Sequence, residues 1–244
     1  MSLKILLNGC RGRMGREIAS LASQCNAEII CAIGTGDSAA EGIKNCDVVI
    51  DFSSHEATLP LVKLAALNKK PTVIGTTGHT EAEKKAILTE LSIIPAVWAG
   101  NYSIGVNVLN YLVEQAALKL GHGYHAEIVE MHHCHKKDAP SGTAEKLIQI
   151  IQAAREIPAS HVLHGRHGIT GERPDNQIGV HSLRGGDVVG DHTVIFAGDG
   201  ERLELMHKAS SRKIFAQGAL RAAHWVVGKS AGLFDMRNVL GIGS

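Results

Sequence analysis

The first hundred residues alternate between apolar runs and segments with helical spacing, and this alternation constrains the fold more than any other feature. Compact runs rich in Ile, Val and Leu predict strands at 3–8, 27–33, 46–52, 71–78 and 96–100. Apolar residues three or four positions apart predict helices after Gly12 and at 57–67 and 81–92. Strands that alternate with helices form a parallel sheet covered on both faces. The predicted fold class is therefore α/β, with a Rossmann-like doubly wound parallel sheet.

A glycine-rich turn, GCRGRMG, follows the first strand. Gly9, Gly12 and Gly15 stand where a backbone turns tightly, approaches a pyrophosphate and lets a helix pack against a strand. Arg11 occupies the place of the second glycine in the usual GxGxxG pattern, and glycines also serve ordinary turns. The position between a strand and an amphipathic helix favours a dinucleotide site.

Three further strand ends bear on the cofactor. GTTG at 75–78 and AGNYS at 99–103 suit a backbone that closes over a nicotinamide ring, although plain turns fit the spacing nearly as well. Gly34, Thr35 and Asp37 follow the second strand, with no Lys or Arg close behind them in the chain. An acid in this place binds ribose hydroxyls, so Asp37 favours NAD over NADP, while a simple turn aspartate explains it equally well.

The second half of the chain changes to mixed α+β material. Helical spacing appears at 106–120 and 143–154, and strand patterns separated by turn residues appear at 125–133, 177–186, 191–198 and 202–210. We expect a second α+β domain at 104–212 with a mixed, mostly antiparallel sheet. A helix from about Ser211 has apolar positions that suit packing on the first domain, which then comprises 1–103 and 213–244.

Charge and composition narrow the partners. The formal net charge is +1 and no long Lys/Arg block is present, so neither nucleic acid nor an anionic membrane is expected as a partner. The first apolar run is too short for a signal peptide and no run of about 18 apolar residues appears, which predicts a cytoplasmic protein. Five cysteines without a CxxC pair indicate reduced thiols and argue against structural zinc.

The segment EMHHCHKKDAPSGTA at 130–144 concentrates titratable side chains. If the strand continues through it, His132, Cys134 and Lys136 share one face and His133 and His135 share the other. This spread is poor for chelation, so no metal site is expected. Proton handling fits better, because a histidine titrates near neutral pH and a lysine beside other cations loses its proton more readily. His132 and Lys136 are the candidates to hold and deliver a proton.

A helix that starts near Ser141 adds an anion site. The backbone N–H groups of Gly142 and Thr143, together with the positive end of the helix dipole, suit a small carboxylate. Asp138 or Ser141 serving only as a cap of a surface helix is the simpler alternative. A dinucleotide site combined with a cationic, proton-donating carboxylate site predicts a reductase.

Several motifs in order along nearly the whole chain resemble the 4-hydroxy-tetrahydrodipicolinate reductase (dihydrodipicolinate reductase) family. They are GCRGRMG, VIGTTG, GNYSIGVN, EMHHCHKKDAPSGTA, LRGGDVVGDHTVIFAGDGERLELMHKASSR and LFDMRNVLG. The resemblance implies NAD(P)H-dependent reduction of 4-hydroxy-tetrahydrodipicolinate to tetrahydrodipicolinate in the diaminopimelate route to lysine. It also implies a homotetramer joined through sheets of the second domain, with 177–209 as the interface.

The resemblance assigns roles residue by residue. His132 resembles the catalytic proton donor and acceptor, and Lys136 resembles the proton donor. The implied substrate-binding residues are His133, Lys136, Gly142 and Thr143. The implied cofactor-binding residues are Gly9, Cys10, Arg11, Gly12, Arg13, Met14, Gly75, Thr76, Thr77, Ala99, Gly100, Asn101 and Tyr102.

One region departs from the family. Many members carry an acid followed by arginine after the second strand and a longer connection to the third, whereas here Gly34 and Thr35 follow Ile33. The choice between NADH and NADPH is therefore open. Two rival functions also remain at this point: another nicotinamide oxidoreductase, for which Cys134 is the candidate catalytic residue, and a dinucleotide sensor without a proton donor.

Overall fold

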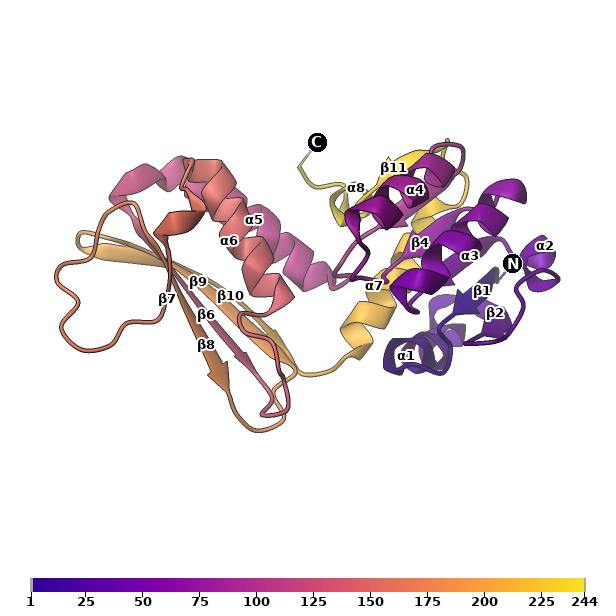
Figure 1. Cartoon of the computed structure of the whole chain (residues 1–244), viewed down its shortest axis with the longest axis horizontal. Helices are drawn as coiled ribbons and strands as arrows, with labels where there is room; N and C mark the ends of the chain where they lie inside the picture. The colour runs from indigo at the N-terminus through magenta and orange to yellow at the C-terminus, as the bar shows by residue number, and fades with distance from the viewer. Residues whose placement is uncertain (1, 244) are drawn as a thin grey trace. The chain divides into compact units, whose positions relative to one another are not determined.

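The computed structural model describes residues 2–243, and its chain divides into two compact units. One unit runs up to Ile104 and resumes at Arg212, and the other is Gly105–Ser211. Figure 1 shows a helix-covered sheet in each unit.

The first unit is built on a six-stranded sheet in the order β11-β5-β4-β3-β1-β2, with every pairing parallel. The strands are β1 (Leu3–Asn8), β2 (Ala27–Ile33), β3 (Val48–Asp51), β4 (Thr72–Ile74), β5 (Pro95–Trp98) and β11 (Gly232–Phe234). The chain goes from β1 outward to β2 and then returns to the other side of β1 as β3. This reversal makes a topological switch point beyond the carboxyl ends of β1 and β3, where open α/β sheets bind their ligands.

Helices cover both faces of this sheet. Apolar residues of α1 (Arg13–Leu21), α7 (Lys213–Val226) and α8 (Met236–Leu240) pack into one core. The opposite core takes side chains from α2 (Gly42–Asn45), α3 (His55–Leu67) and α4 (Glu81–Leu91). The predicted packing of the last long helix on the first domain is confirmed. Its approach is so close that a Cβ added at Gly218 would lie 1.7 Å from the Tyr102 carbonyl oxygen.

The second unit contains a five-stranded sheet in the order β10-β9-β6-β8-β7. Its strands are β6 (His125–His132), β7 (Val162–His164), β8 (Ile178–Arg184), β9 (Gly190–Gly198) and β10 (Glu201–Ala209). The sheet is mixed, as predicted, with two antiparallel pairings at β9 and two parallel pairings at β8. The antiparallel share is thus smaller than expected. Helices α5 (Ile104–Leu120) and α6 (Gly142–Arg155) pack on one face and bury its aliphatic residues.

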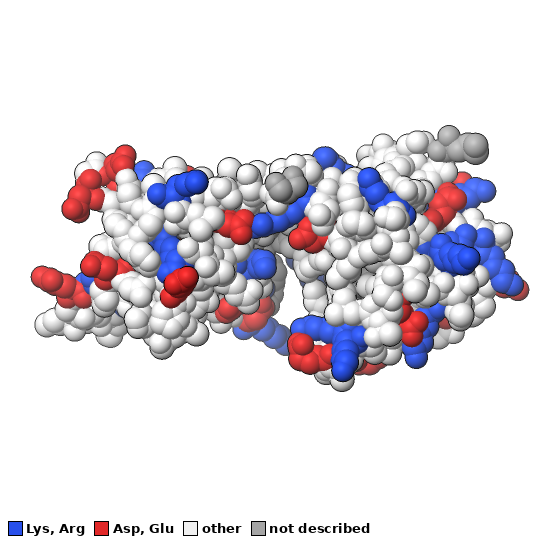
Figure 2. Space-filling model, turned by 90° about the horizontal axis from the view of Figure 1, so that it is seen from above, with Lys and Arg blue, Asp and Glu red and all other residues white. Residues whose placement is uncertain are grey.

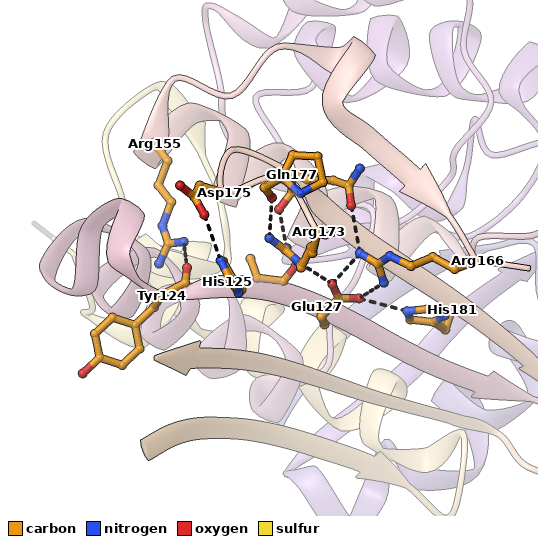
Figure 3. Close-up of polar contacts among 11 residues, drawn as sticks. Tyr124, His125, Glu127, Arg155, Arg166, Arg173, Asp175, Gln177 and His181 are labelled. Carbon is orange, nitrogen blue, oxygen red and sulfur yellow. Dashed lines mark hydrogen bonds and ion pairs between the residues drawn. The ribbon is translucent and has the colours of Figure 1, made fainter. Parts of the chain in front are cut away.

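The other face of this sheet is held by a charged cluster around Glu127 (Figure 3). Arg166 donates to both carboxylate oxygens of Glu127 at 2.8 and 3.1 Å, and Arg173 Nε donates at 2.9 Å. His181 Nε2 lies 2.9 Å from the same carboxylate. Burial raises the pKa of Glu127, but the hydrogen bonds from Arg166, His181 and Arg173 together bring it down to about 2. The cluster thereby ties the 165–177 loop to β6 and β8.

Two observations concern the surface. Lys and Arg side chains are interspersed with Asp and Glu side chains over the face drawn in Figure 2. Among residues 2–243, no helix combines the length and apolar character needed to cross a membrane.

Candidate active site

The glycine turn after β1 has the tight geometry that its sequence predicts. Gly9 has φ +84°, and a Cβ there would lie 2.1 Å from the Phe52 carbonyl oxygen. A Cβ at Gly15 would lie 2.2 Å from the Gly9 carbonyl oxygen, so α1 can approach the turn only without a side chain at this position. Gly12 precedes α1 and provides no side-chain cap for the first N–H groups of the helix, an arrangement that suits anion binding.

A cavity of about 670 Å³ opens at the switch point of the first sheet. Its lining includes Asn8 and Gly9 from the end of β1, Ile33 from the end of β2 and Phe52 and Ser53 after β3. The size falls within the usual range of small-molecule sites. The structure thus places the predicted glycine turn at the wall of a cavity large enough for part of a dinucleotide.

Arg11 changes the interpretation of the turn after β2. Its guanidinium donates to the Thr35 carbonyl oxygen at 3.2 Å and to Asp37 Oδ2 at 2.8 Å. The same Asp37 oxygen accepts the Gly34 N–H at 2.9 Å. No Lys or Arg follows Asp37 closely in the chain, so the sequence indicated no cation near it. The glycine turn supplies that cation from 26 positions earlier in the chain.

A fully buried carboxylate, Asp51, supports the strand ends around the cavity. Its Oδ1 accepts hydrogen bonds from Asn8 Nδ2 at 2.8 Å and Ser53 Oγ at 2.5 Å. Its Oδ2 accepts from the hydroxyls of Thr58 at 2.7 Å and Thr76 at 2.9 Å. Four neutral donors therefore satisfy this carboxylate and connect β1, β3, α3 and the segment after β4. Sequence reasoning missed Asp51, because an acid that ends a strand carries no local signal of its partners.

The predicted nicotinamide-side residues lie at neighbouring strand ends, but two of their side chains face inward. Thr76 is buried on Asp51, and Tyr102 is buried with its hydroxyl donating to the carbonyl oxygens of Ile74 and Val97 at 2.8 and 3.0 Å. Burial raises the pKa of the Tyr102 phenol well above its ordinary value. These two side chains shape the strand ends, so any cofactor contact they make comes from their backbone. A Cβ at Gly75 would overlap the Phe52 ring at 2.2 Å.

In the second unit, the histidine segment leaves the strand earlier than predicted. Strand β6 ends at His132, and the next residues form turns whose N–H groups bond elsewhere. The His133 N–H donates to the Val188 carbonyl oxygen at 2.8 Å and the Cys134 N–H to the Gly186 carbonyl oxygen at 3.2 Å. The expectation that Cys134 and Lys136 share a strand face with His132 is therefore wrong. The backbone of His133 and Cys134 is thus hydrogen-bonded to the loop between β8 and β9.

His132 lies in a network centred on Glu130. The two side chains sit on the same face of β6, and His132 Nδ1 is 2.6 Å from Glu130 Oε2. Arg184, opposite His132 on β8, donates to both Glu130 oxygens at 2.9 Å. Burial raises the pKa of Glu130, but hydrogen bonds led by Arg184 and His132 outweigh it, so the pKa lies below its ordinary value. Sequence reasoning missed both Glu130 and Arg184.

A second histidine joins this network from β9. His192 lies edge-on to His132, with ring centroids 5.2 Å apart, and its Nε2 is 2.9 Å from Ser141 Oγ. Burial, followed by the electrostatic effect of the neighbouring His132, lowers the pKa of His192 to about 4, so it is neutral at pH 7. Ser141 Oγ also accepts the Ala144 N–H at 3.2 Å and so caps α6. The predicted helix start is confirmed, with Gly142 and Thr143 as its first residues.

Lys136 has an anionic partner that the sequence interpretation left out. Its ammonium group donates to both oxygens of Asp138, at 2.7 and 2.9 Å. Arg184 donates to the Asp138 carbonyl oxygen at 2.7 Å, which ties the loop back to the Glu130 network. Asp138 therefore pairs with Lys136, and the cap of α6 is Ser141. No three metal-ligating side chains converge anywhere in residues 2–243.

The fold and these two sets of residues are typical of an oxidoreductase that uses a nicotinamide dinucleotide. The chain belongs to the dihydrodipicolinate reductase family. The model of the N-terminus of dihydrodipicolinate reductase matches residues 3–102, and the model of its C-terminus matches residues 105–240. The family uses NADH or NADPH.

Two relatives are similar to this chain over nearly its whole length. The chain is 52% identical over 245 residues to 4-hydroxy-tetrahydrodipicolinate reductase of Akkermansia muciniphila, covering 98% of both proteins. It is 45% identical over 267 residues to the protein of the same name from Thiobacillus denitrificans, covering 99% of this chain and 100% of the relative.

A solved structure supports the fold. A dipicolinate-bound dihydrodipicolinate reductase from a Paenisporosarcina species aligns with a TM-score of 0.78 at 24% identity, over 96% of this chain and 98% of that chain. The predicted combination of a Rossmann-like sheet with a second mixed-sheet unit is confirmed.

Proposed function

We propose that this chain reduces 4-hydroxy-tetrahydrodipicolinate to tetrahydrodipicolinate with NADH or NADPH, in lysine biosynthesis by the diaminopimelate pathway. The observation that carries the proposal is the cluster of His132, Glu130 and Arg184 beside the start of α6. It combines a proton-transferring imidazole with a helix N-terminus that suits a carboxylate. The relatives that match the full length of this chain are named for the same reaction.

The first unit is proposed to bind the dinucleotide, which supplies a hydride when bound. The N–H groups at the glycine turn, over 9–14, suit the pyrophosphate at the start of α1. The segments 75–77 and 99–102 suit the nicotinamide end, because they follow β4 and β5 at the same edge of the parallel sheet. Within both segments, backbone groups and small side chains make the contacts.

The second unit is proposed to bind the cyclic dicarboxylate and provide the proton. The first N–H groups of α6, at Gly142 and Thr143, suit one carboxylate, with His133 and Lys136 beside them in the chain. His132 and Lys136 are the proposed proton-transferring groups. Lys136 bonds to Asp138 in this structure, so an incoming carboxylate competes with Asp138 for the ammonium group.

Assembly and location are part of the proposal. We place a homotetramer interface on the sheet face of the second unit that α5 and α6 do not cover, within 177–209. Leu183 and Met206 lie on this face with 48% and 53% of their surface exposed. A face with such apolar groups suits association with a second copy. Light scattering, which gives the molar mass in solution, tests the assembly, and cell fractionation tests the proposed cytoplasmic location.

Lys136→Ala tests the proposed proton donor. Loss of a positioned acid lowers turnover by roughly 10²-fold or more, so we expect a fall of this size with NADH binding unchanged. The assay follows NADH or NADPH oxidation on substrate generated in place by the preceding synthase, and NADH binding is measured separately by fluorescence. Lys137→Ala, which removes the exposed neighbouring charge, is the matched control.

The outcomes separate the rival functions. Wild-type turnover in Lys136→Ala would show that Lys136 is not the proton donor. Loss of turnover in Cys134→Ser would instead favour a different nicotinamide oxidoreductase, since Cys134 is exposed in the loop after His132. A wild-type protein that binds NADH but oxidises none with the synthase product would favour a dinucleotide sensor.

A further inference from the structure

Glu130 is a buried acid with an unusual set of partners. It has no exposed surface, and its partners donate hydrogen bonds to it: His132, Arg184, the Ser182 side chain and the Ser141 N–H at 3.3 Å. Arg184 neutralises its charge with a bidentate ion pair. A buried, paired carboxylate of this kind adds little net stability compared with an apolar residue of similar size. Its position next to the proposed catalytic histidine suggests a role in the reaction.

The contact with Glu130 fixes which nitrogen of His132 carries a proton. Glu130 is ionised, because its pKa lies below the ordinary value, and an ionised carboxylate only accepts hydrogen bonds. At 2.6 Å from the carboxylate, Nδ1 of His132 must therefore be the N–H nitrogen. Proton exchange with a substrate is then left to Nε2.

The Nε2 side of His132 lies against a glycine. Gly190, the first residue of β9, lies beside the ring, and a Cβ there would be 2.9 Å from Nε2 of His132. The same Cβ would be 3.5 Å from Cε1 of His192. The φ of Gly190 is not in the left-handed region, so its backbone does not require glycine. Glycine is needed here because a side chain at this position would collide with Nε2.

Glu130 also links His132 to the other proposed substrate-binding groups. Its Oε1 accepts the N–H of Ser141, the residue that caps α6 immediately before Gly142. Through Arg184 it is joined to the Asp138 carbonyl, and Asp138 holds Lys136. One carboxylate is thus bonded to His132 and to the residue that caps α6, and it is linked to Lys136 through Arg184 and Asp138.

We infer that Glu130 is a positioning residue of the reaction: it keeps the His132 proton on Nδ1 and holds the ring so that Nε2, beside Gly190, is the nitrogen that exchanges a proton. The inference rests on the proposed function for its catalytic meaning. The tautomer of His132 is measurable without substrate or cofactor, so the two claims fail separately.

The test compares Glu130→Gln with Glu127→Gln. Both remove the charge of a glutamate on β6 that pairs with arginine, but Glu127 lies on the opposite face, away from His132. In Glu130→Gln the amide NH₂ can donate to Nδ1, so we expect His132 to carry its proton on Nε2. Turnover should fall by about 10²-fold or more, as expected when a catalytic histidine is held in the wrong tautomer, with little change in the KM for NADH.

Long-range ¹H–¹⁵N spectra of protein with ring-labelled histidine give the tautomer. The His132 signals are assigned by their absence from His132→Asn. Glu127→Gln should keep both the wild-type tautomer and turnover close to wild type. An unchanged His132 tautomer in Glu130→Gln, or wild-type turnover in that variant, overturns the inference. If wild-type protein shows no synthase-dependent oxidation, the proposed function fails while the spectra still test the positioning.

Gly190→Ala is a second, steric test that leaves Glu130 in place. Its Cβ needs the space at Nε2, so turnover should fall at least 10-fold while NADH binding and the Nδ1–H tautomer are kept. Wild-type turnover in Gly190→Ala would overturn the claim that Nε2 of His132 is the reacting nitrogen. This variant also keeps the inference testable if Glu130→Gln fails to fold.

Discussion

Arg11→Gln tests how the chain discriminates between NADH and NADPH. In sheets of this type, the turn after the second strand meets the adenosine ribose, where an acid binds the ribose hydroxyls and an arginine binds a 2′-phosphate. Arg11 and Asp37 both lie at this turn and pair with each other at 2.8 Å. The two side chains should therefore act in opposite directions, with Arg11 favouring NADPH and Asp37 favouring NADH.

The size of the expected change in NADPH binding follows from the solvent exposure of the Arg11–Asp37 ion pair. Arg11 and Asp37 are 64% and 37% exposed, so their ion pair contributes at most about 1 kcal/mol and is easily given up. A hydrogen bond from a guanidinium to a phosphate contributes about 1.5–3 kcal/mol. The net gain for NADPH is then about 1–2 kcal/mol, or roughly tenfold in Kd. We expect Arg11→Gln to raise the Kd of NADPH about tenfold and to leave the Kd of NADH nearly unchanged.

The assay is titration of each reduced dinucleotide by nicotinamide fluorescence, at low and at moderate salt. Asp37→Asn should shift the ratio of the two Kd values the other way, because it removes a negative charge beside the phosphate. Arg221→Gln, which removes an exposed arginine on α7, controls for the general loss of positive charge. Equal weakening of NADH and NADPH binding in Arg11→Gln would refute the argument, as would no change in either.

Two further predictions concern the second unit. The folded-state pKa of Glu127, about 2, lies below its ordinary 4.5, so its stabilisation of about 3 kcal/mol is present above pH 4.5 and is lost as the pH falls toward 2. Urea unfolding followed by circular dichroism should therefore show that wild type loses more stability than Glu127→Gln between pH 7 and 3. Glu172→Gln, in the 165–177 loop, is the control. Equal losses of stability in wild type and Glu127→Gln would contradict this prediction. Met206→Asp places a charge on the proposed interface and should lower the molar mass measured by light scattering at unchanged helix content, whereas a retained tetramer mass would place the interface elsewhere.

Elements with strong local patterns were predictable from the sequence. The residues predicted for β1 and β2 match the observed strands, because each is a compact, mostly apolar run that a turn ends. The predicted helix at 81–92 is α4, whose start is marked by a capping box between Thr80 and Glu83. Strands β7 and β11 were missed, since each has only three residues and none of them is buried. Their pairing with longer neighbours creates these strands, and a local pattern does not record it.

The residues of the candidate site also fall into two groups, those that the sequence predicted and those that it did not. His132, Lys136, Gly142 and Thr143 were recognisable because they fall within one short segment of the chain. Their partners were not, because strand pairing supplies them.

Arg184 is brought next to His132 by the register of β6 with β8, and His192 next to Glu130 by the register of β6 with β9. A shift of one residue in either register would turn these side chains to the opposite face of the sheet. The chemistry of His132 therefore depends on two strand registers, and an isolated motif carries no information about either. The proposed role of Glu130 was for this reason accessible only after the pairing of the three strands was known.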